Sequence, residues 1–301
     1  MERRNVKIAF IGLGVMGLPM ASNLVSAGMT VVGFNRSPGK ADRLVAAGGA
    51  KADSVASAVQ GADAVVTMLP DSPDVRAVYE GDHGILANAT PNTLLIDMSS
   101  IRPDVAIALH EASAAVSMQM LDAPVSGGEQ GAIDGVLSIM VGGTTDAFEK
   151  ARPILSTVGS TIVHVGGPGA GQTVKAANQL LVAGTIELVA EALVFLDAHG
   201  VELAPAVEVL NGGLAGSTSL TRKGASMLAG RFAPGFRVEL HHKDLGIYRE
   251  AARAKNVFSP LASVVADLMN SLRVTGGADL DHSAMLTQVD QLSGRTRWTR
   301  P

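Results

Sequence analysis

The sequence predicts an α/β protein in which a wound parallel sheet is followed by a mostly helical second half. From Val6 to Val165, short apolar runs alternate with longer stretches of helical pattern, as in consecutive strand–helix–strand units. After the glycine-rich segment Gly166–Gly171, the pattern changes to long helix-like segments. The chain has 301 residues, 47% of them apolar, so it is long enough to bury a large core and to form two domains.

The strands are predicted from the short apolar runs. In chain order they are Val6–Ile11, Thr30–Phe34, Ala64–Leu69, Thr93–Asp97, Leu137–Val141 and Thr161–Val165. The second half has an apolar stripe at helical spacing, formed by Val174, Ala177, Leu181, Leu188, Ala192 and Phe195. Gly212–Gly213 and Gly276–Gly277 are predicted to interrupt helices there.

The composition excludes several classes of function. The formal net charge is −4, from 24 basic and 28 acidic side chains, and no block of like charge gives a reason to expect nucleic acid or an anionic membrane surface as partner. The absence of cysteine excludes a disulfide framework, thiolate catalysis and cysteine-ligated metals. With 34 glycines and few aromatic residues, the composition fits an enzyme that acts on a small metabolite.

Two apolar segments could be taken for a secretory signal and a membrane span, but their sequences favour a soluble protein. The basic start and the apolar stretch after it are similar to a secretory signal, but Gly12, Gly14 and Gly17 interrupt that stretch, which favours a buried strand ending in a glycine turn. The stretch Gln179–Leu196 contains two glutamates, which are costly in hydrocarbon. We therefore expect a soluble, cytoplasmic protein with no membrane partner.

A glycine pattern, GxGxxG, follows the first predicted strand. Its residues are Gly12, Leu13, Gly14, Val15, Met16 and Gly17. The pattern is short, but it opens a helical segment directly after a strand, which is the context of a dinucleotide-binding turn. There the first glycine forms the turn, the second lets a diphosphate approach the backbone, and the third lets the helix pack on the sheet. The free N–H groups of the helix N-terminus face the diphosphate. The alternative, an ordinary strand-to-helix turn, is weaker in this context.

The residues after the second predicted strand indicate which nucleotide binds. NAD-dependent enzymes usually place Asp or Glu here to bind the ribose hydroxyls. This chain has Asn35, Arg36 and Ser37 instead. Arg36 can pair with the additional phosphate of NADP, and Asn35 and Ser37 can donate hydrogen bonds to it. The sequence therefore predicts NADP as the preferred cofactor, with NAD as the alternative; Arg36 as a solvated loop cation is the competing interpretation.

Seven motifs follow one another along the chain. They are GLGVMGLPM (12–20), MLPDSP (68–73), IDMSSI (96–101), LDAPVSGGEQGAIDG (121–135), GAGQTVKAANQ (169–179), GGLAGS (212–217) and PGFRVELHHKDL (234–245). In this order they resemble the β-hydroxyacid dehydrogenase family, over nearly the whole chain. The resemblance implies a Rossmann-type NAD(P)-binding domain over residues 1–166, a long connecting helix, and an all-helical substrate and dimerisation domain over residues 167–301. It also implies reversible hydride transfer between NAD(P)H and a small acid bearing an aldehyde or alcohol.

Lys175 is the predicted catalytic residue. The resemblance places the family's catalytic lysine here, and the chemistry needs such a group, because the carbonyl oxygen becomes an alkoxide that must be protonated or stabilised. Asn178 and Gln179 follow three and four positions later, so one helical surface can present an acid and two amides to the substrate. A polar helix face toward solvent is the alternative interpretation.

Two further segments are predicted to bind the substrate. Ser126, Gly127 and Gly128 match the family's carboxylate loop, where a hydroxyl and unshielded N–H groups can hold a small anion. A plain turn is the alternative for this loop. Lys243 matches the second domain's contribution, near the nicotinamide and the substrate carboxylate, and Asp244 is expected to orient or balance it.

The resemblance adds cofactor contacts at the carboxyl ends of later strands. Met68, Leu69 and Pro70 are expected to border the cofactor, and Ser100 is expected to approach the nicotinamide. Both places are where open α/β sheets bind ligands. Asp74 is a looser match to a position near the cofactor.

A metal site and two departures from the family remain. His241, His242 and Asp244 form a weak metal candidate, because adjacent residues on a helix point about 100° apart and the family uses no metal; we expect none. His242 stands where the family usually has an apolar residue, so its role is left open. Asn35 stands where related reductases have an acid, which bears on NAD preference but not on the chemistry.

The resemblance, together with Arg36, implies an NADPH-preferring reductase of tartronate semialdehyde that forms glycerate. Alternatives within the family are a 3-hydroxyisobutyrate dehydrogenase and a glyoxylate or succinic semialdehyde reductase, because one methylene in a pocket changes binding by only about 1–3 kcal/mol. Imine reductases share a related scaffold but lack a lysine at the position of Lys175. A non-catalytic NADP-binding module is a further alternative, which the acid-binding residues disfavour. The long apolar stripe suggests a homodimer or homotetramer.

Overall fold

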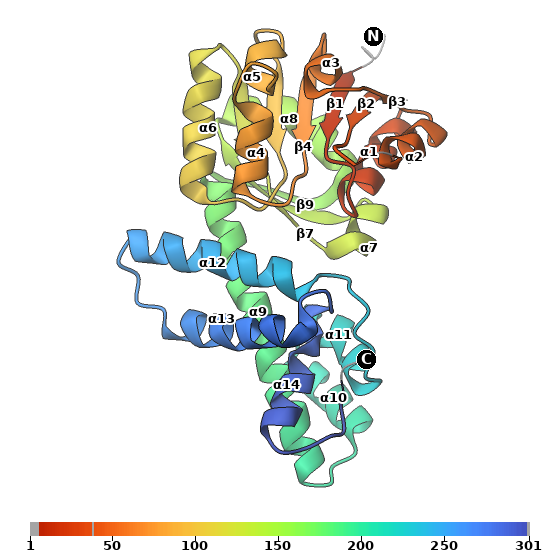
Figure 1. Ribbon diagram of the computed structural model, residues 1–301, viewed down its shortest axis with the longest axis vertical. Helices are drawn as coiled ribbons and strands as arrows, with labels where there is room; N and C mark the ends of the chain where they lie inside the picture. The colour runs from red at the N-terminus through yellow and green to blue at the C-terminus, as the bar shows by residue number, and fades with distance from the viewer. Residues whose placement is uncertain (1–5, 38, 300–301) are drawn as a thin grey trace. The chain divides into compact units, whose positions relative to one another are not determined.

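The computed structural model describes residues 6–37 and 39–299, which divide into two compact units. The first unit ends at Lys175 and the second begins at Ala176. This division lies somewhat beyond residue 166, where the sequence predicts the domain boundary. The predicted fold class is confirmed: the first unit is an α/β domain and the second is all-helical (Figure 1).

The first unit is built on one mixed sheet. Within the described residues its strands lie in the order β3-β2-β1-β4-β5-β6-β8-β7, with β9 paired to β8. Their bounds are β1 (Lys7–Ile11), β2 (Thr30–Phe34), β3 (Ala50–Lys51), β4 (Ala64–Thr67), β5 (Leu94–Asp97), β6 (Gln119–Asp122), β7 (Val125–Ser126), β8 (Leu137–Gly143) and β9 (Gly159–Gly166). Strands β1 to β6 pair in parallel, whereas β8 runs antiparallel to β6 and β7 and parallel to β9.

Helices cover both faces of this sheet (Figure 1). They are α1 (Gly17–Ser26), α2 (Lys40–Ala46), α3 (Val55–Val59), α4 (Ser72–Tyr79), α5 (Ile85–Asn88), α6 (Pro103–Ala115), α7 (Gly128–Ile133) and α8 (Thr145–Val158). In β1, Ile8 and Phe10 pack into the core shared with α1, α2, α7 and α8. Ala9 and Ile11 pack into the core shared with α3 to α6. Because both faces are buried, the parallel strands are continuous apolar runs, which is why the sequence reveals them.

All six predicted strands are present, with ends that differ from the prediction by at most two residues. The sequence does not predict β3, β6 and β7. Strands β3 and β7 are only two residues long. In β6, Gln119 and Asp122 flank Met120 and Leu121, so the apolar run is too short to stand out.

The second unit consists of helices. Their bounds, including the start of α9 in the first unit, are α9 (Ala170–Ala198), α10 (Leu203–Gly212), α11 (Thr218–Leu228), α12 (Val238–Ala254), α13 (Pro260–Leu272) and α14 (Met285–Leu292), with short turns at Arg273–Gly277 and His282–Ala284. The core of this unit contains Ile186, Leu193, Leu245 and Met269. Both predicted interruptions are confirmed, since α10 ends at Gly212 and Gly276 has a φ of +98°.

Helix α9 is apolar on two faces. One face is buried in the core of the second unit by Ala183, Ile186, Ala190 and Leu193. The predicted stripe lies elsewhere on the helix, where Leu181, Leu188 and Phe195 are 71%, 66% and 62% exposed. Within the described residues, α9 is the one helix long and apolar enough to cross a membrane, and part of that length is buried inside the protein.

Candidate active site

The glycine turn after β1 has the geometry that a dinucleotide requires. Gly12 has a φ of +100°, and a Cβ there would lie 2.3 Å from the carbonyl oxygen of Met68. A Cβ on Gly17 would lie 1.9 Å from the carbonyl oxygen of Gly12, so α1 packs directly against the turn. A Cβ on Gly14 would meet nothing within 4 Å. The first and third glycines therefore serve packing, and the second leaves room for a diphosphate at the backbone.

The other residues of the turn connect it to the loop after β2. Leu13 is buried and its N–H donates to Asn35 Oδ1 at 2.9 Å. Asn35 Nδ2 donates to the carbonyl oxygen of Ser37 at 3.0 Å. Val15 is 61% exposed and Met16 is half-buried before α1. Since both ends of the Asn35 amide bind protein atoms, Asn35 shapes the loop, and its contact with the nucleotide stays a prediction.

Arg36 extends from the same loop into solvent. Its side chain is 88% exposed, and Nη1 lies 3.5 Å from Oδ1 of Asp74 at the start of α4. A guanidinium held by an exposed ion pair is available to an incoming phosphate, because such pairs are weak. Asp74, a looser match in the sequence, is thus the described acid that faces Arg36.

The loops after β4 and β5 meet at the same edge of the sheet. Met68, Leu69 and Pro70 follow β4, and Ser100 follows β5. The N–H of Leu69 donates to Ser99 Oγ at 2.9 Å, which joins the two loops. Because β1, β4 and β5 are parallel neighbours, their carboxyl ends bring the predicted cofactor residues of the first unit together.

Asp97 is a buried acid at this edge that the sequence analysis does not single out. Its Oδ1 accepts hydrogen bonds from Thr67 Oγ1 at 2.7 Å and from Ser99 Oγ at 2.6 Å. Burial raises the pKa of the Asp97 carboxyl to about 6, against the lowering effect of these hydrogen bonds. Asp97 therefore fixes the two loops that border the predicted cofactor site.

Ser126, Gly127 and Gly128 form a backbone turn that suits a small anion. Ser126 ends β7 and is half-buried. Gly127 and Gly128 have φ values of +143° and +67°, a region that side chains disfavour, and a Cβ on Gly128 would meet nothing within 4 Å. The loop thus exposes its backbone, as the predicted carboxylate site requires.

Lys175 lies in the second turn of α9 and is 8% exposed. Among the described residues, no other lysine or arginine is buried to this degree. A lysine is seldom buried in a folded protein. Its position is therefore consistent with a functional cation rather than a surface one.

In the second unit, the structure brings four predicted residues together. Asn178 Nδ2 donates to Gln179 Oε1 at 2.8 Å, and Gln179 Nε2 donates to Asp244 Oδ2 at 2.5 Å. Lys243 Nζ lies 2.8 Å from Asp244 Oδ1. Asp244 is buried, so its carboxylate holds an amide from α9 and an ammonium from α12 in fixed places.

The histidines of the weak metal candidate have other partners. His241 Nε2 donates to the carbonyl oxygen of Gln179 at 3.1 Å, and His241 Nδ1 lies 2.8 Å from His282 Nδ1. Burial lowers the pKa of His282 to about 3 and also lowers the pKa of the half-buried His242. Within the described residues, no three acidic or histidine side chains are grouped as a metal site would need. His241 thus supports the backbone of Gln179.

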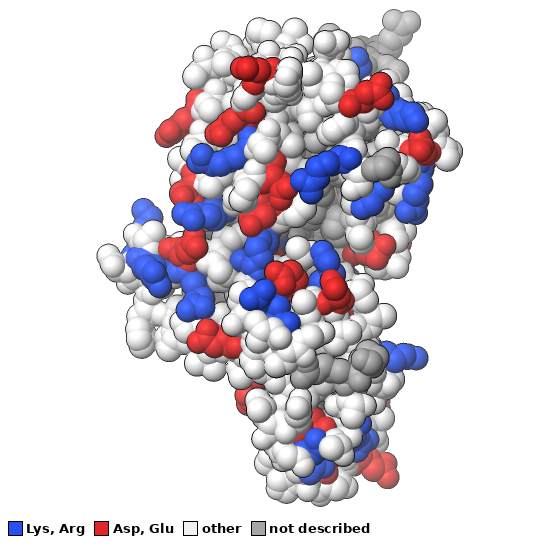
Figure 2. Space-filling model, viewed as in Figure 1, with Lys and Arg blue, Asp and Glu red and all other residues white. Residues whose placement is uncertain are grey.

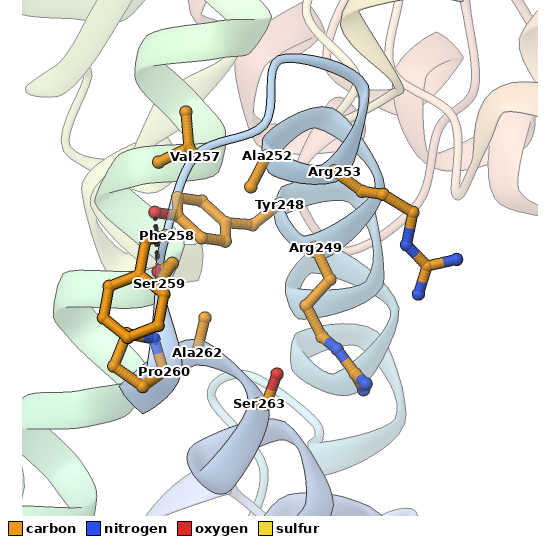
Figure 3. A pocket seen from close by; sticks show the side chains of 10 residues that line it. All are labelled: Tyr248, Arg249, Ala252, Arg253, Val257, Phe258, Ser259, Pro260, Ala262 and Ser263. Atoms are coloured by element: carbon orange, nitrogen blue, oxygen red, sulfur yellow. Dashed lines mark hydrogen bonds between the residues drawn. The ribbon is translucent and has the colours of Figure 1, made fainter.

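A separate hollow lies between α12 and α13 in the second unit (Figure 3). Its volume is about 350 Å³, and Tyr248 and Phe258 are among the residues that line it. The Tyr248 hydroxyl and Ser259 Oγ form a 3.0 Å hydrogen bond at its side. No predicted site residue lines this hollow, so it is distinct from the polar group of Asn178, Gln179, Lys243 and Asp244.

Comparison with known proteins gives matches along nearly the whole chain. Residues 7–166 match the NAD-binding domain of 6-phosphogluconate dehydrogenase, and residues 169–289 match the NAD-binding model of NADP-dependent 3-hydroxyisobutyrate dehydrogenase. The 2-hydroxy-3-oxopropionate reductase of Escherichia coli (strain K12) is 38% identical, over 96% of this chain and 98% of that protein. The NAD-dependent L-serine dehydrogenase of Pseudomonas aeruginosa is 40% identical, over 96% and 99%.

A solved structure is similar to this chain in both fold and sequence. Mycobacterium tuberculosis 3-hydroxyisobutyrate dehydrogenase with L-serine has a TM-score of 0.88 and 37% identity, covering 95% of this chain and 99% of that chain. The chain belongs to the β-hydroxyacid dehydrogenase family. As a member of this family it is an NAD(P)-dependent oxidoreductase of hydroxyacids, which confirms the predicted reaction class. The names of the relatives differ in substrate and in cofactor.

Proposed function

We propose that this β-hydroxyacid dehydrogenase is an NADPH-preferring reductase that converts tartronate semialdehyde, or 2-hydroxy-3-oxopropionate, to glycerate. The observation that carries the chemistry is Lys175, a lysine 8% exposed in the second turn of α9. The substrate is taken from the Escherichia coli reductase, which is 38% identical over 96% of this chain.

A bound nicotinamide supplies the hydride, and Lys175 supplies the proton. As electrons reach the carbonyl, its oxygen gains negative charge, which the Lys175 ammonium stabilises and then neutralises by donating a proton. In the reverse direction the neutral amine accepts the hydroxyl proton. A positioned acid of this kind typically contributes about 10²- to 10⁴-fold to the rate.

The remaining polar residues recognise the substrate's acid group. The Ser126 hydroxyl and the N–H groups of Gly127 and Gly128 can donate to a carboxylate. Lys243 adds positive charge that favours an anionic substrate, and Asp244 holds Lys243 at 2.8 Å. A site with these donors favours substrates that carry the acid over substrates that lack it, because only the acid can accept these hydrogen bonds.

The cofactor preference rests on Arg36. An arginine whose described ion pair is with Asp74 at the surface can exchange that carboxylate for the additional phosphate of NADPH. NADH is the alternative, and one relative is named as NAD-dependent. The glycine turn does not distinguish NADPH from NADH, because the two cofactors have the same diphosphate.

A 3-hydroxyisobutyrate dehydrogenase is the second candidate. The solved Mycobacterium tuberculosis enzyme with that name has a TM-score of 0.88 to this chain. The two candidate substrates share an acid and an aldehyde, so the same residues would serve either.

We also propose a cytoplasmic protein that forms a homodimer or homotetramer. The exposed apolar face of α9 supports assembly, since an isolated chain would leave Leu181, Leu188 and Phe195 in water. Basic and acidic side chains are interspersed on the face drawn in Figure 2, which supports a protein without a nucleic-acid partner.

The test is the absorbance loss of NADPH and, separately, of NADH with purified protein. Tartronate semialdehyde, methylmalonate semialdehyde, glyoxylate and succinic semialdehyde are the substrates. We expect the highest kcat/KM for NADPH with tartronate semialdehyde. Highest activity with methylmalonate semialdehyde would replace the first candidate by the second, and oxidation with none of the four would contradict both.

A further inference from the structure

Two backbone N–H groups at the start of α9 donate to a side chain on a strand of the sheet. The first N–H groups of a helix have no partner within it and are usually satisfied by the side chain of the preceding residue. Here that residue is Gly169, which has no side chain. Asp122 at the end of β6 takes its place: Oδ1 accepts from the Gly169 N–H and Oδ2 from the Gln172 N–H, both at 2.9 Å.

The Asp122 carboxylate is tightly enclosed. It is fully buried, and His110 Nε2 of α6 lies 3.1 Å from Oδ1, where it can donate a third hydrogen bond. A Cβ on Gly142 of β8 would lie 2.6 Å from Asp122 Oδ1, and a Cβ on Gly171 of α9 would lie 2.9 Å from Oδ2. Two glycines are therefore required for α9 and β8 to approach this carboxylate.

The same turn of α9 is also fixed by Gln172. Its Oε1 accepts from the Ile101 N–H at 3.0 Å, and its Nε2 donates to the carbonyl oxygen of Ser99 at 2.8 Å. These contacts tie α9 to the loop that contains Ser100. Lys175 follows Gln172 by three residues, which places the two on the same side of the helix. The place of Lys175 in the first unit thus depends on the turn that Asp122 and Gln172 hold.

We propose that Asp122 is a positioning residue for Lys175: it sets the start of α9 and thereby the place of the lysine amine relative to the loops at the carboxyl ends of β4 and β5. The expected effect on kcat rests on the proposed function. The hydrogen bonds by which Asp122 fixes the start of α9 do not depend on it. The proposed role of Asp122 needs no contact with the reacting atoms.

The first test replaces Asp122 by asparagine. In Asp122→Asn one oxygen becomes an NH2 group, so the N–H of either Gly169 or Gln172 must face a donor. We expect kcat to fall by about 100-fold, the order expected when a reacting group is misplaced by about 1 Å. NADPH affinity, measured by fluorescence, should be retained. Unchanged kcat would overturn the proposal.

A double-mutant cycle separates positioning from a general loss of structure. If Asp122 acts through Lys175, then Asp122→Asn should slow Lys175→Ala no further. If the two losses multiply, Asp122 acts by another route and the proposal is wrong. Asp290→Asn is the matched control, because Asp290 is equally buried and accepts from the Trp298 N–H, far from α9's start in sequence. It should leave kcat unchanged.

A second readout is independent of any substrate. Hydrogen exchange over residues 168–176 should be faster in Asp122→Asn than in wild type, because the N–H of Gly169 or that of Gln172 loses its acceptor. If wild type reduces no aldehyde, the proposed function fails while this exchange still tests the anchor; unchanged exchange would overturn it. Should Asp122→Asn not fold, His110→Phe removes one donor to the carboxylate and should lower kcat, whereas His110→Gln retains a donor and should preserve it.

Discussion

At the scale of single residues, the proposed choice of NADPH over NADH rests on one guanidinium. Arg36 is 88% exposed and is paired at 3.5 Å with Asp74, so little structure would be lost with its side chain. We expect Arg36→Ala to lower kcat/KM for NADPH by about 10- to 100-fold, since a hydrogen bond to a charged group contributes about 1.5–3 kcal/mol. The value for NADH should change little.

Two variants control this experiment. Asp74→Asn removes a negative charge that would repel the additional phosphate, so it should raise the preference for NADPH. Arg43→Ala removes another exposed cation, in α2, and should change neither value. Equal losses for NADPH and NADH in Arg36→Ala would show that Arg36 supports the loop rather than the phosphate.

Functional residues could be predicted from the sequence where they stand in a local sequence motif. The glycine turn and Lys175 stand in recognisable motifs, and their surroundings in the structure fit the predicted roles. Asp122 also stands in a motif, but its partners at the start of α9 are 47 and 50 residues away. No local pattern encodes such a pairing, because it exists only once β6 and α9 have been brought together.

At the scale of elements, the parallel core strands could be predicted because burial on both faces makes them uniformly apolar. Strand β6 could not be predicted, because both of its ends are polar. Its end residues bind side chains of α6 and α8. The helix α9 shows a further limit. Its predicted apolar stripe and its buried face are different faces, which a single apolar periodicity cannot distinguish.

Helix α9 also contains a buried acid that makes stability depend on pH. Glu187 is 5% exposed and its Oε2 has no hydrogen-bond partner among the described residues. Burial, with a contribution from Glu191, raises the pKa of Glu187 from 4.5 to about 7. The folded state therefore binds this proton more tightly than the unfolded state, and its stabilising effect is full below pH 4.5 and lost as the pH rises through 7.

The expected result is a difference between wild type and Glu187→Gln. One pKa unit corresponds to about 1.4 kcal/mol, so the wild-type free energy of unfolding should fall by about 3 kcal/mol between pH 4 and 8 through this group. Glu187→Gln should lack that fall and be the more stable protein at pH 8. Urea denaturation at both pH values measures it. Glu191→Gln, on the exposed side of α9, should keep most of the wild-type slope, and an identical slope in Glu187→Gln would exclude Glu187 as the cause.

At the scale of the whole molecule, the exposed apolar face of α9 is the basis of the proposed assembly. Leu181, Leu188 and Phe195 are seven residues apart, so they form one continuous stripe along the helix. Each is more than half exposed, and burying such a side chain contributes about 1.5–3 kcal/mol. Three of them, repeated on a second copy across a two-fold axis, would provide the apolar centre of a self-complementary interface.

We therefore expect wild type to elute as a dimer or tetramer in size-exclusion chromatography with light scattering, and Leu188→Lys to shift the mass toward a single chain. Leu188 is the middle residue of the stripe and is 66% exposed, so the folded unit tolerates the change while an apolar interface does not. Val209→Lys, at a residue 75% exposed on α10, is the matched control and should retain the wild-type mass. If wild type is itself a monomer, the stripe is not a contact between copies; if Leu188→Lys keeps the full mass, the copies meet elsewhere.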